Sequence, residues 1–233
     1  AVALAKTADD WSFIFAFSDG AYADNTPYTA FNGVSEADYS LTPRFQWKFA
    51  GDWKQFDDFT SPRGSQYACM LGGALHWQQS RNTAAPTDVD VDVFRYTVDL
   101  SVEGDGWNVF GAFYGANTNL NTLGTDPSSL QDFGAVIQGG FMVSDKVELY
   151  GRWDAIFADS NRGYAEDNMN FVTLGVNYYM AGHAAKFSFD GVVSLEDTSG
   201  LVSDGYLPNT NTGLLGDTDS GEVVLRAQFQ LMF

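Results

Sequence analysis

The stretch EVVLRAQFQLMF, residues 222–233, decides the fold. One side of it carries Val223, Leu225, Ala227, Phe229, Leu231 and Phe233, and the residues between them are mostly polar. Because successive side chains of a β-strand point to opposite faces, the pattern predicts a strand with one apolar and one polar face. A strand of about ten residues that ends on an aromatic side chain is typical of outer-membrane β-barrels. Soluble β-sandwiches contain similar strands, so the interpretation depends on the rest of the chain.

The same alternation recurs along the chain. In residues 39–49 a row of apolar side chains alternates with polar ones that include Arg44 and Lys48, as expected for a strand between lipid and water. The pattern predicts about ten strands, at residues 11–17, 39–49, 67–77, 91–102, 107–114, 133–143, 147–157, 169–180, 185–195 and 222–233.

The predicted connections are alternately long and short. The short ones contain turn-forming residues, and the long ones are 18–37, 78–90, 115–131, 158–168 and 196–221. Transmembrane barrels have short periplasmic turns and long external loops, which places the polar connector 50–66 on the periplasmic side. We therefore predict a single all-β domain over residues 1–233, a transmembrane antiparallel up-and-down β-barrel.

The composition agrees with many strands and tight turns. Charged residues make up 18% and aromatic residues 15% of the chain, with 24 glycines. No stretch approaches about eighteen consecutive apolar residues, so a transmembrane helix is excluded and membrane residence requires a barrel. The net charge of −18 excludes nucleic acid as a partner. Residues 1–6 lack the basic region of a signal peptide, so we expect that an export signal was removed or that the natural start lies upstream.

Aromatic residues are predicted to form two girdles at the membrane interfaces. Those near periplasmic strand ends are Trp47, Phe49, Trp107, Tyr178 and Phe233, and those near outer strand ends are Tyr39, Trp77 and Phe157.

The polar faces of the strands are predicted to line a lumen. They carry Arg44, Lys48, Arg95, Asp99, Glu148, Tyr150, Arg152, Asp154, Lys186, Asp190, Glu222 and Arg226. Charges in a narrow passage of low dielectric focus the electric field and set ion preference. The arginines recur at comparable strand depths, which indicates an arginine-lined wall. Because acidic and basic groups are interleaved, an equally good interpretation is that they pair and stiffen the barrel.

Asp88, Asp90 and Asp92 alternate in the segment TDVDVDV, so their carboxylates project to one side. Such a row is a weak candidate for Ca²⁺, which takes about six to eight oxygen ligands. The spacing and the glycine of an EF-hand are missing. A solvated acidic loop is the stronger interpretation, and we predict no cofactor.

The sequence predicts that the protein is not an enzyme. A hydrolase in an outer-membrane barrel needs a histidine paired with a carboxylate or a serine nucleophile. His76 stands between Leu75 and Trp77, and His183 falls in a short turn, so neither indicates a catalytic site. The single Cys69 cannot form an internal disulfide, and it lies on an apolar face, where we expect a small buried or lipid-facing side chain.

Several segments follow one another in a recognisable order. They are TPRFQWKFAGDWKQFDDFTSPRG (42–64) with a glycine-rich strand ending in His76, DKVELYGRWD (145–154), FVTLGVNYYMAGHAAKFSFD (171–190) and the terminal VVLRAQFQLMF. In this order they resemble the carboxy-terminal part of porins of the phosphate-selective porin O and P family.

The resemblance implies a trimeric channel of about sixteen to eighteen strands in a Gram-negative outer membrane. About ten strands are too few for such a barrel, so we expect this chain to be the carboxy-terminal portion of a longer porin. Charge is a second departure, because 12 Lys and Arg stand against 30 Asp and Glu, whereas the resemblance implies a basic pore. The resemblance therefore supports a porin and leaves the choice between anions and cations open.

The expected function is passive diffusion of small hydrophilic solutes or ions across the bacterial cell outer membrane. The expected partners are outer-membrane lipid and two further copies of the chain in a homotrimer. One alternative is a small barrel plugged by its own side chains, with a structural or adhesive role. Another is a soluble β-sandwich, which would purify without detergent.

Overall fold

Antiparallel β-strands make up most of the protein. The computed structural model describes residues 1–18, 36–82, 89–121, 129–162, 168–197 and 220–232. These ranges contain eleven strands: β1 (Val2–Thr7), β2 (Trp11–Ser18), β3 (Glu36–Ala50), β4 (Ala68–Asn82), β5 (Val89–Gly104), β6 (Trp107–Asn121), β7 (Ser129–Ser144), β8 (Val147–Phe157), β9 (Asn168–Tyr179), β10 (Ala185–Ser194) and β11 (Val223–Leu231). They also contain two 3-10 helices, η1 (Trp53–Asp57) and η2 (Ser160–Arg162). No helix within the described ranges is long and apolar enough to cross a membrane.

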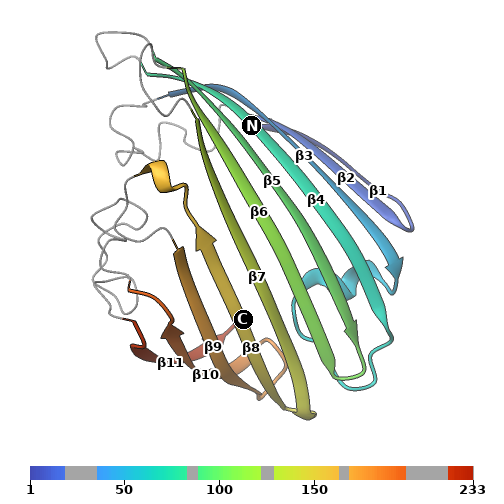
Figure 1. Cartoon of the computed structure of the whole chain (residues 1–233). Helices are drawn as coiled ribbons and strands as arrows, with labels where there is room; N and C mark the ends of the chain where they lie inside the picture. Colours follow the sequence, from blue (N-terminus) through green and yellow to red (C-terminus); the bar gives the residue numbers. More distant parts are fainter. Residues whose placement is uncertain (19–35, 83–88, 122–128, 163–167, 198–219, 233) are drawn as a thin grey trace.

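The strands form one curved sheet in which each strand pairs with its neighbours in sequence (Figure 1). Every pairing is antiparallel. Among the residues that the structure describes, β1 and β11 are the two edges and do not pair with each other. The predicted all-β, up-and-down antiparallel order is confirmed. The sheet is open, so its closure into a barrel stays a prediction.

The hydrophobic pattern of the sequence does not predict strand β1, which the structure contains. It is rich in alanine, which has a low strand propensity, and all its residues are exposed. It pairs with β2 along its whole length, from Val2 opposite Phe17 to Thr7 opposite Ser12. Backbone pairing to a neighbour makes this segment a strand where its side chains give little signal.

Several strands extend further than their apolar residues predict. Residues 78–82, 115–121 and 129–131 were expected in loops and belong to β4, β6 and β7. Their polar residues continue the ladder, with Asp92 opposite both Gln79 and Asn119. A polar side chain indicates contact with solvent and does not by itself end a strand. A prediction from apolar residues alone therefore makes these strands too short.

Apart from the segment 51–67, the connections sort by length onto the two ends of the sheet. Because the strands alternate in direction, the connections that follow odd-numbered strands share one end, which we call the short-turn end. It holds the turns at 8–10, 105–106, 145–146 and 180–184 and the segment 51–67. Gly106 and Gly182 have φ values of +74° and +55° there, which favour glycine in tight turns. The connections through 19–35, 83–88, 122–128, 158–167 and 195–222 belong to the opposite end, as the sequence predicts.

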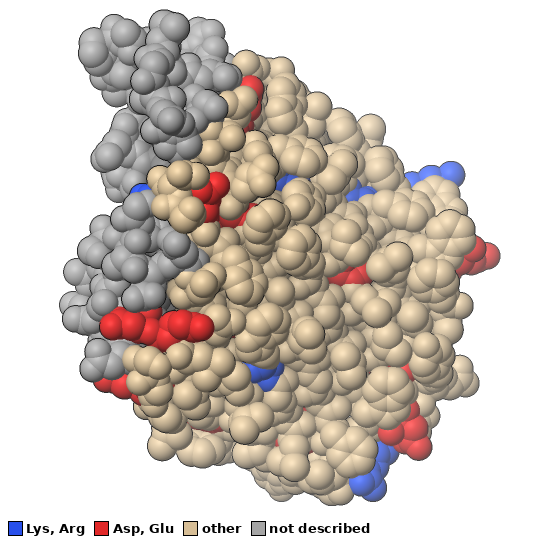
Figure 2. All heavy atoms as spheres, in the orientation of Figure 1, with Lys and Arg blue, Asp and Glu red and all other residues tan. Residues whose placement is uncertain are grey.

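The convex face of the sheet is apolar and exposed, and the concave face is polar and buried. Leu174 and Ile137 on the convex face are 67% and 57% exposed, whereas Glu148 and Asp190 on the concave face are 3% and 8% exposed. Figure 2 shows the outer surface of the sheet almost without charged side chains. A sheet of a soluble domain normally buries its apolar face, so the arrangement here is the reverse.

The predicted alternation of β3 is confirmed side chain by side chain. Phe45, Trp47 and Phe49 are exposed on the convex face, and Arg44, Gln46 and Lys48 alternate with them on the concave face.

The aromatic residues of the convex face only partly form the predicted girdles. Trp47 and Tyr178 lie exposed near the short-turn end, and Tyr39 packs edge to face on Trp77 near the other end, with ring centroids 5.3 Å apart. Phe113 and Phe189 lie midway along their strands, so aromatic side chains also cover the middle of this face. Phe233 falls outside the described residues.

Candidate functional site

The concave face is the candidate functional site, because it gathers the charged residues of the strands. Strand alternation places every predicted lumen residue within the strands on this face: Arg44, Lys48, Arg95, Asp99, Glu148, Tyr150, Arg152, Asp154, Lys186, Asp190 and Arg226. The pairing of the strands then decides which of these side chains meet.

Arg44 and Asp99 form a two-pronged ion pair. Arg44 Nη1 and Nη2 each donate to one oxygen of Asp99 at 2.8 Å. The two residues lie on β3 and β5, so the pair spans the intervening strand β4 at Gly72. A Cβ atom on Gly72 would lie 2.6 Å from Arg44 Nη2 and would also collide with the Asp99 carboxylate. Glycine at this position is therefore what allows the ion pair to lie flat on the sheet.

A second bridge of the same design joins β8, β10 and β11. Tyr150 donates its hydroxyl to Asp190 Oδ2 at 2.7 Å, and Arg226 Nε donates to Asp190 Oδ1 at 2.7 Å. The tyrosine ring crosses β9 over Gly175, where a Cβ atom would collide with the ring and lie 2.7 Å from Asp190 Cβ. Asp190 thus has a donor on each oxygen although it is nearly buried.

Glu148 is the most completely enclosed carboxylate of the site. It accepts hydrogen bonds from Asn108 Nδ2 at 3.2 Å, Asn177 Nδ2 at 2.9 Å and the Tyr179 hydroxyl at 2.6 Å. The contact with Asn108 crosses β7 over Gly140. A buried carboxylate without partners would cost several kcal/mol, so these donors are what keep Glu148 in place.

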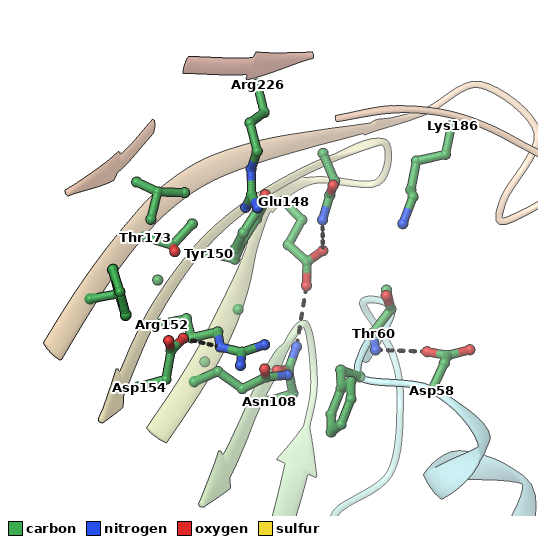
Figure 3. Close-up of a pocket in the computed structure, with 18 of the residues that line it drawn as sticks. Asp58, Thr60, Asn108, Glu148, Tyr150, Arg152, Asp154, Thr173, Lys186 and Arg226 are labelled. Atoms are coloured by element: carbon green, nitrogen blue, oxygen red, sulfur yellow. Dashed lines mark hydrogen bonds and ion pairs between the residues drawn. The ribbon is translucent and has the colours of Figure 1, made fainter. Parts of the chain in front are cut away.

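The wall formed by β8–β11 borders a cavity of about 1010 Å³ (Figure 3). Arg152 Nε donates to Asp154 Oδ1 at 2.5 Å, and the Lys186 ammonium lies 5.8 Å from the centre of the Tyr179 ring. The side chains of Arg152 and Arg226 are still 47% and 59% exposed. These two arginines therefore pair with carboxylates and also present charge to the cavity.

Other predicted lumen residues border different spaces. Arg44 and Asp99 line a separate cavity of about 350 Å³, and Arg95 lines one of about 560 Å³. The Lys48 ammonium interacts with two groups of the segment 51–67: it donates to the carbonyl of Gly51 at 2.6 Å and lies over the ring of Trp53. Much of the charge on the concave face is thus paired and part of it faces open space, so the arginine-lined wall and the paired, stiffening charges both stay predictions.

The acidic row is described only in part. Asp88 lies outside the described residues, and so does the side chain of Asp90. Asp92 shares its face with Phe94 and therefore lies on the convex side. The described part of the chain contains no group of three or more His, Cys, Asp or Glu that could hold a metal ion.

The histidines and the cysteine occupy ordinary positions with one unexpected contact. His76 Nδ1 lies 2.8 Å from Thr42 Oγ1 on the concave face, and Cys69 is half-buried at the start of β4. His183 Nε2 lies 3.4 Å from Asp58 Oδ2. This histidine–carboxylate contact joins distant parts of the chain, so the neighbours in sequence could not reveal it.

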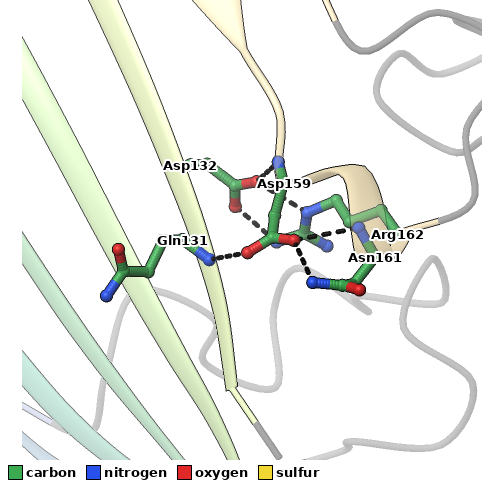
Figure 4. Close-up of polar contacts among 5 residues, drawn as sticks. All are labelled: Gln131, Asp132, Asp159, Asn161 and Arg162. Atoms are coloured by element: carbon green, nitrogen blue, oxygen red, sulfur yellow. Dashed lines mark hydrogen bonds and ion pairs between the residues drawn. The ribbon is translucent and has the colours of Figure 1, made fainter. Parts of the chain in front are cut away.

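A polar cluster anchors η2 to the end of the sheet opposite the short-turn end (Figure 4). Asp159 accepts the backbone N–H of Gln131 at 2.7 Å and that of Asn161 at 2.9 Å. Asp132 accepts the backbone N–H of Asp159 at 3.1 Å and pairs with Arg162. The two backbone donors hold the pKa of Asp159 below its usual value.

Comparisons with known proteins give no relatives for this chain. No family model, no curated protein and no solved structure matches it.

Sequence reasoning missed the glycines and the asparagines that complete the bridges. Gly72, Gly140 and Gly175 fall at positions of their strands that alternate onto the concave face, as the charged residues do. This common position is a signal that the sequence contains. Which strands face each other across a glycine depends on the register, which the sequence does not state.

A methyl group on Gly72 is expected to destabilise the protein. Gly72→Ala forces apart the Arg44–Asp99 pair and lowers the free energy of unfolding by about 1–3 kcal/mol, as overpacking does. Gly73→Ala is the matched control, since its Cβ atom would lie 3.5 Å from the carbonyl of Thr97 in ordinary contact. Urea unfolding of both variants under identical conditions measures the difference. Equal stability of the two variants would contradict the bridging role of Gly72.

The Asp159 anchor is expected to weaken in acid. Because the folded pKa is below the unfolded one, its contribution to stability is present above the unfolded pKa of about 4 and is lost as the pH falls through the folded pKa. The difference in thermal unfolding midpoint between wild type and Asp159→Asn should therefore be constant from neutral pH down to about pH 5 and shrink below about pH 4. Asp145→Asn, in an exposed turn, is the control. A difference that grows on acidification would refute the anchor.

Proposed function

We propose that this protein forms the wall of an outer-membrane porin that passes small hydrophilic solutes or ions by diffusion. The observation that carries the proposal is the reversal of the two faces, with an exposed apolar convex face and a polar concave face. Lipid-facing apolar and lumen-facing polar side chains are what a transmembrane barrel requires. The location that follows is the bacterial outer membrane.

The segregation of the connections also supports the proposal. Apart from the segment 51–67, the connections at the short-turn end are tight turns and the longer connections lie at the other end, as in barrels whose short turns face the periplasm. The exposed aromatic residues Trp47, Phe49 and Tyr178 near the short-turn end suit the interface between lipid and water.

A channel needs a closed wall, so the proposal requires partners for the outer edges of β1 and β11. Further strands of the same barrel would satisfy their unpaired backbone groups, which lipid cannot. A porin of about sixteen to eighteen strands, assembled as a homotrimer, is the form we propose. The intact mass of the protein from its native membrane tests this: a value well above 25.5 kDa supports the larger barrel.

A plugged barrel with a structural or adhesive role is the second candidate. It is favoured by the pairing of interior charges, with Asp99, Glu148 and Asp190 all hydrogen-bonded and buried. The two candidates differ in whether ions pass through the barrel.

Planar-bilayer recording is expected to give steady single-channel openings. Arg226→Gln removes a positive charge from the lumen, so the reversal potential in a salt gradient should shift toward cation preference. Leu225→Ala, the neighbouring residue on the convex face, should leave the reversal potential unchanged.

Two outcomes contradict the proposal in different ways. A wild-type protein that inserts into the bilayer without openings indicates the plugged barrel. A protein that purifies and remains folded without detergent indicates a soluble sheet.

A further inference from the structure

The segment 51–67 between β3 and β4, which we call the strap, leaves the wall and runs across the concave side. It contains η1 and lies at the short-turn end of the sheet (Figure 1). The other described connections at this end are short turns. A long connection at an end that otherwise has tight turns calls for a physical reason.

The first anchors of the strap hold it to the blue and green strands of Figure 1. Trp53 Nε1 donates to the carbonyl of Ala8 at 2.9 Å, in the turn between β1 and β2. Ser61 is 1% exposed, and its hydroxyl donates to the carbonyl of Gly104 at 2.5 Å. The backbone N–H of Gly106 donates to the carbonyl of Pro62 at 3.1 Å.

The remaining anchors hold the strap to strands further along the sheet, at β7 and at β9 with the turn that follows it. The Arg63 guanidinium donates to the carbonyls of Met142 and Val143 at the end of β7, at 2.8–3.1 Å. Thr60 Oγ1 lies 2.9 Å from the Tyr179 hydroxyl, and Asp58 contacts His183 in the turn between β9 and β10. The strap therefore spans the curved sheet from its β1–β2 turn to its β9–β10 turn.

The middle of the strap, residues 58–60, borders the open space on the concave side. These residues line the 1010 Å³ cavity together with Arg152, Lys186 and Arg226 (Figure 3). Asp58 and Phe59 also line the 350 Å³ cavity that contains Arg44 and Asp99. Phe59 packs edge to face on Phe110 of β6, with ring centroids 4.9 Å apart. Residues 58–60, the tip of the strap, thus border the larger cavity, and two of them, Asp58 and Phe59, border both cavities.

We propose that the tip of the strap is the constriction of the channel, inserted from the short-turn end. The inference rests on the proposed porin function and names the residues that set its size limit. Asp58, Phe59 and Thr60 narrow the passage by their bulk, and their anchors hold them at a defined depth. A strap that served only as a brace would affect stability and leave the conductance of the folded protein unchanged.

Single-channel conductance in planar bilayers tests the constriction. Trimming the tip in Asp58→Ala/Phe59→Ala/Thr60→Ala is expected to raise the conductance by about twofold and to admit larger neutral polyethylene glycols. Phe59→Trp keeps every polar anchor and adds bulk, so it should lower the conductance. Lys54→Ala/Gln66→Ala changes exposed strap residues that line neither cavity and should match the wild type.

The results separate this inference from the proposed function. A wild type without openings overturns both. Wild-type openings with the same conductance in the trimmed protein and in Phe59→Trp overturn the constriction alone. Because Phe59→Trp removes no anchor, it decides the matter even where the trimmed variant does not fold.

Discussion

The constraint on which the structure depends is that charged groups lie on the concave, enclosed side of a curved sheet. Asp99, Glu148 and Asp190 are nearly inaccessible to solvent there, and a carboxylate in such a place is stable only with donors around it. Each of them has a donor from a strand that is not its immediate neighbour: Arg44 for Asp99, Asn108 for Glu148 and Tyr150 for Asp190. These polar contacts thus connect alternate strands on the concave face, where a soluble sheet would have apolar contacts.

Glycine makes these ties possible. A polar contact that skips a strand has to cross the backbone of the strand between, and Gly72, Gly140 and Gly175 leave room for that crossing. The strap adds ties of longer range, from the β1–β2 turn to the β9–β10 turn. The curvature of the open sheet is therefore supported from its concave side at two scales, across single strands and across the whole short-turn end.

Much of the fold could be predicted from local patterns. Alternation along β3 and β11 and the short turns at Gly106 and Gly182 are properties of neighbouring residues, and they predict antiparallel strands in sequence order. The pattern failed where local signals are weak or misleading, at the alanine-rich β1 and at the polar ends of β4 and β6. In those places the ladder to the neighbouring strand decides the conformation.

The sequence by itself determined which side chains share a face, because a strand places every second residue on the same side. It thereby collected Arg44, Asp99, Arg152, Asp190 and Arg226 on one surface. Only the tertiary structure decided which of them meet, since a contact across a glycine depends on the register of three strands and not on distance along the chain. The same holds for Asp58 and Thr60, whose contacts with His183 and Tyr179 arise because the strap crosses the sheet.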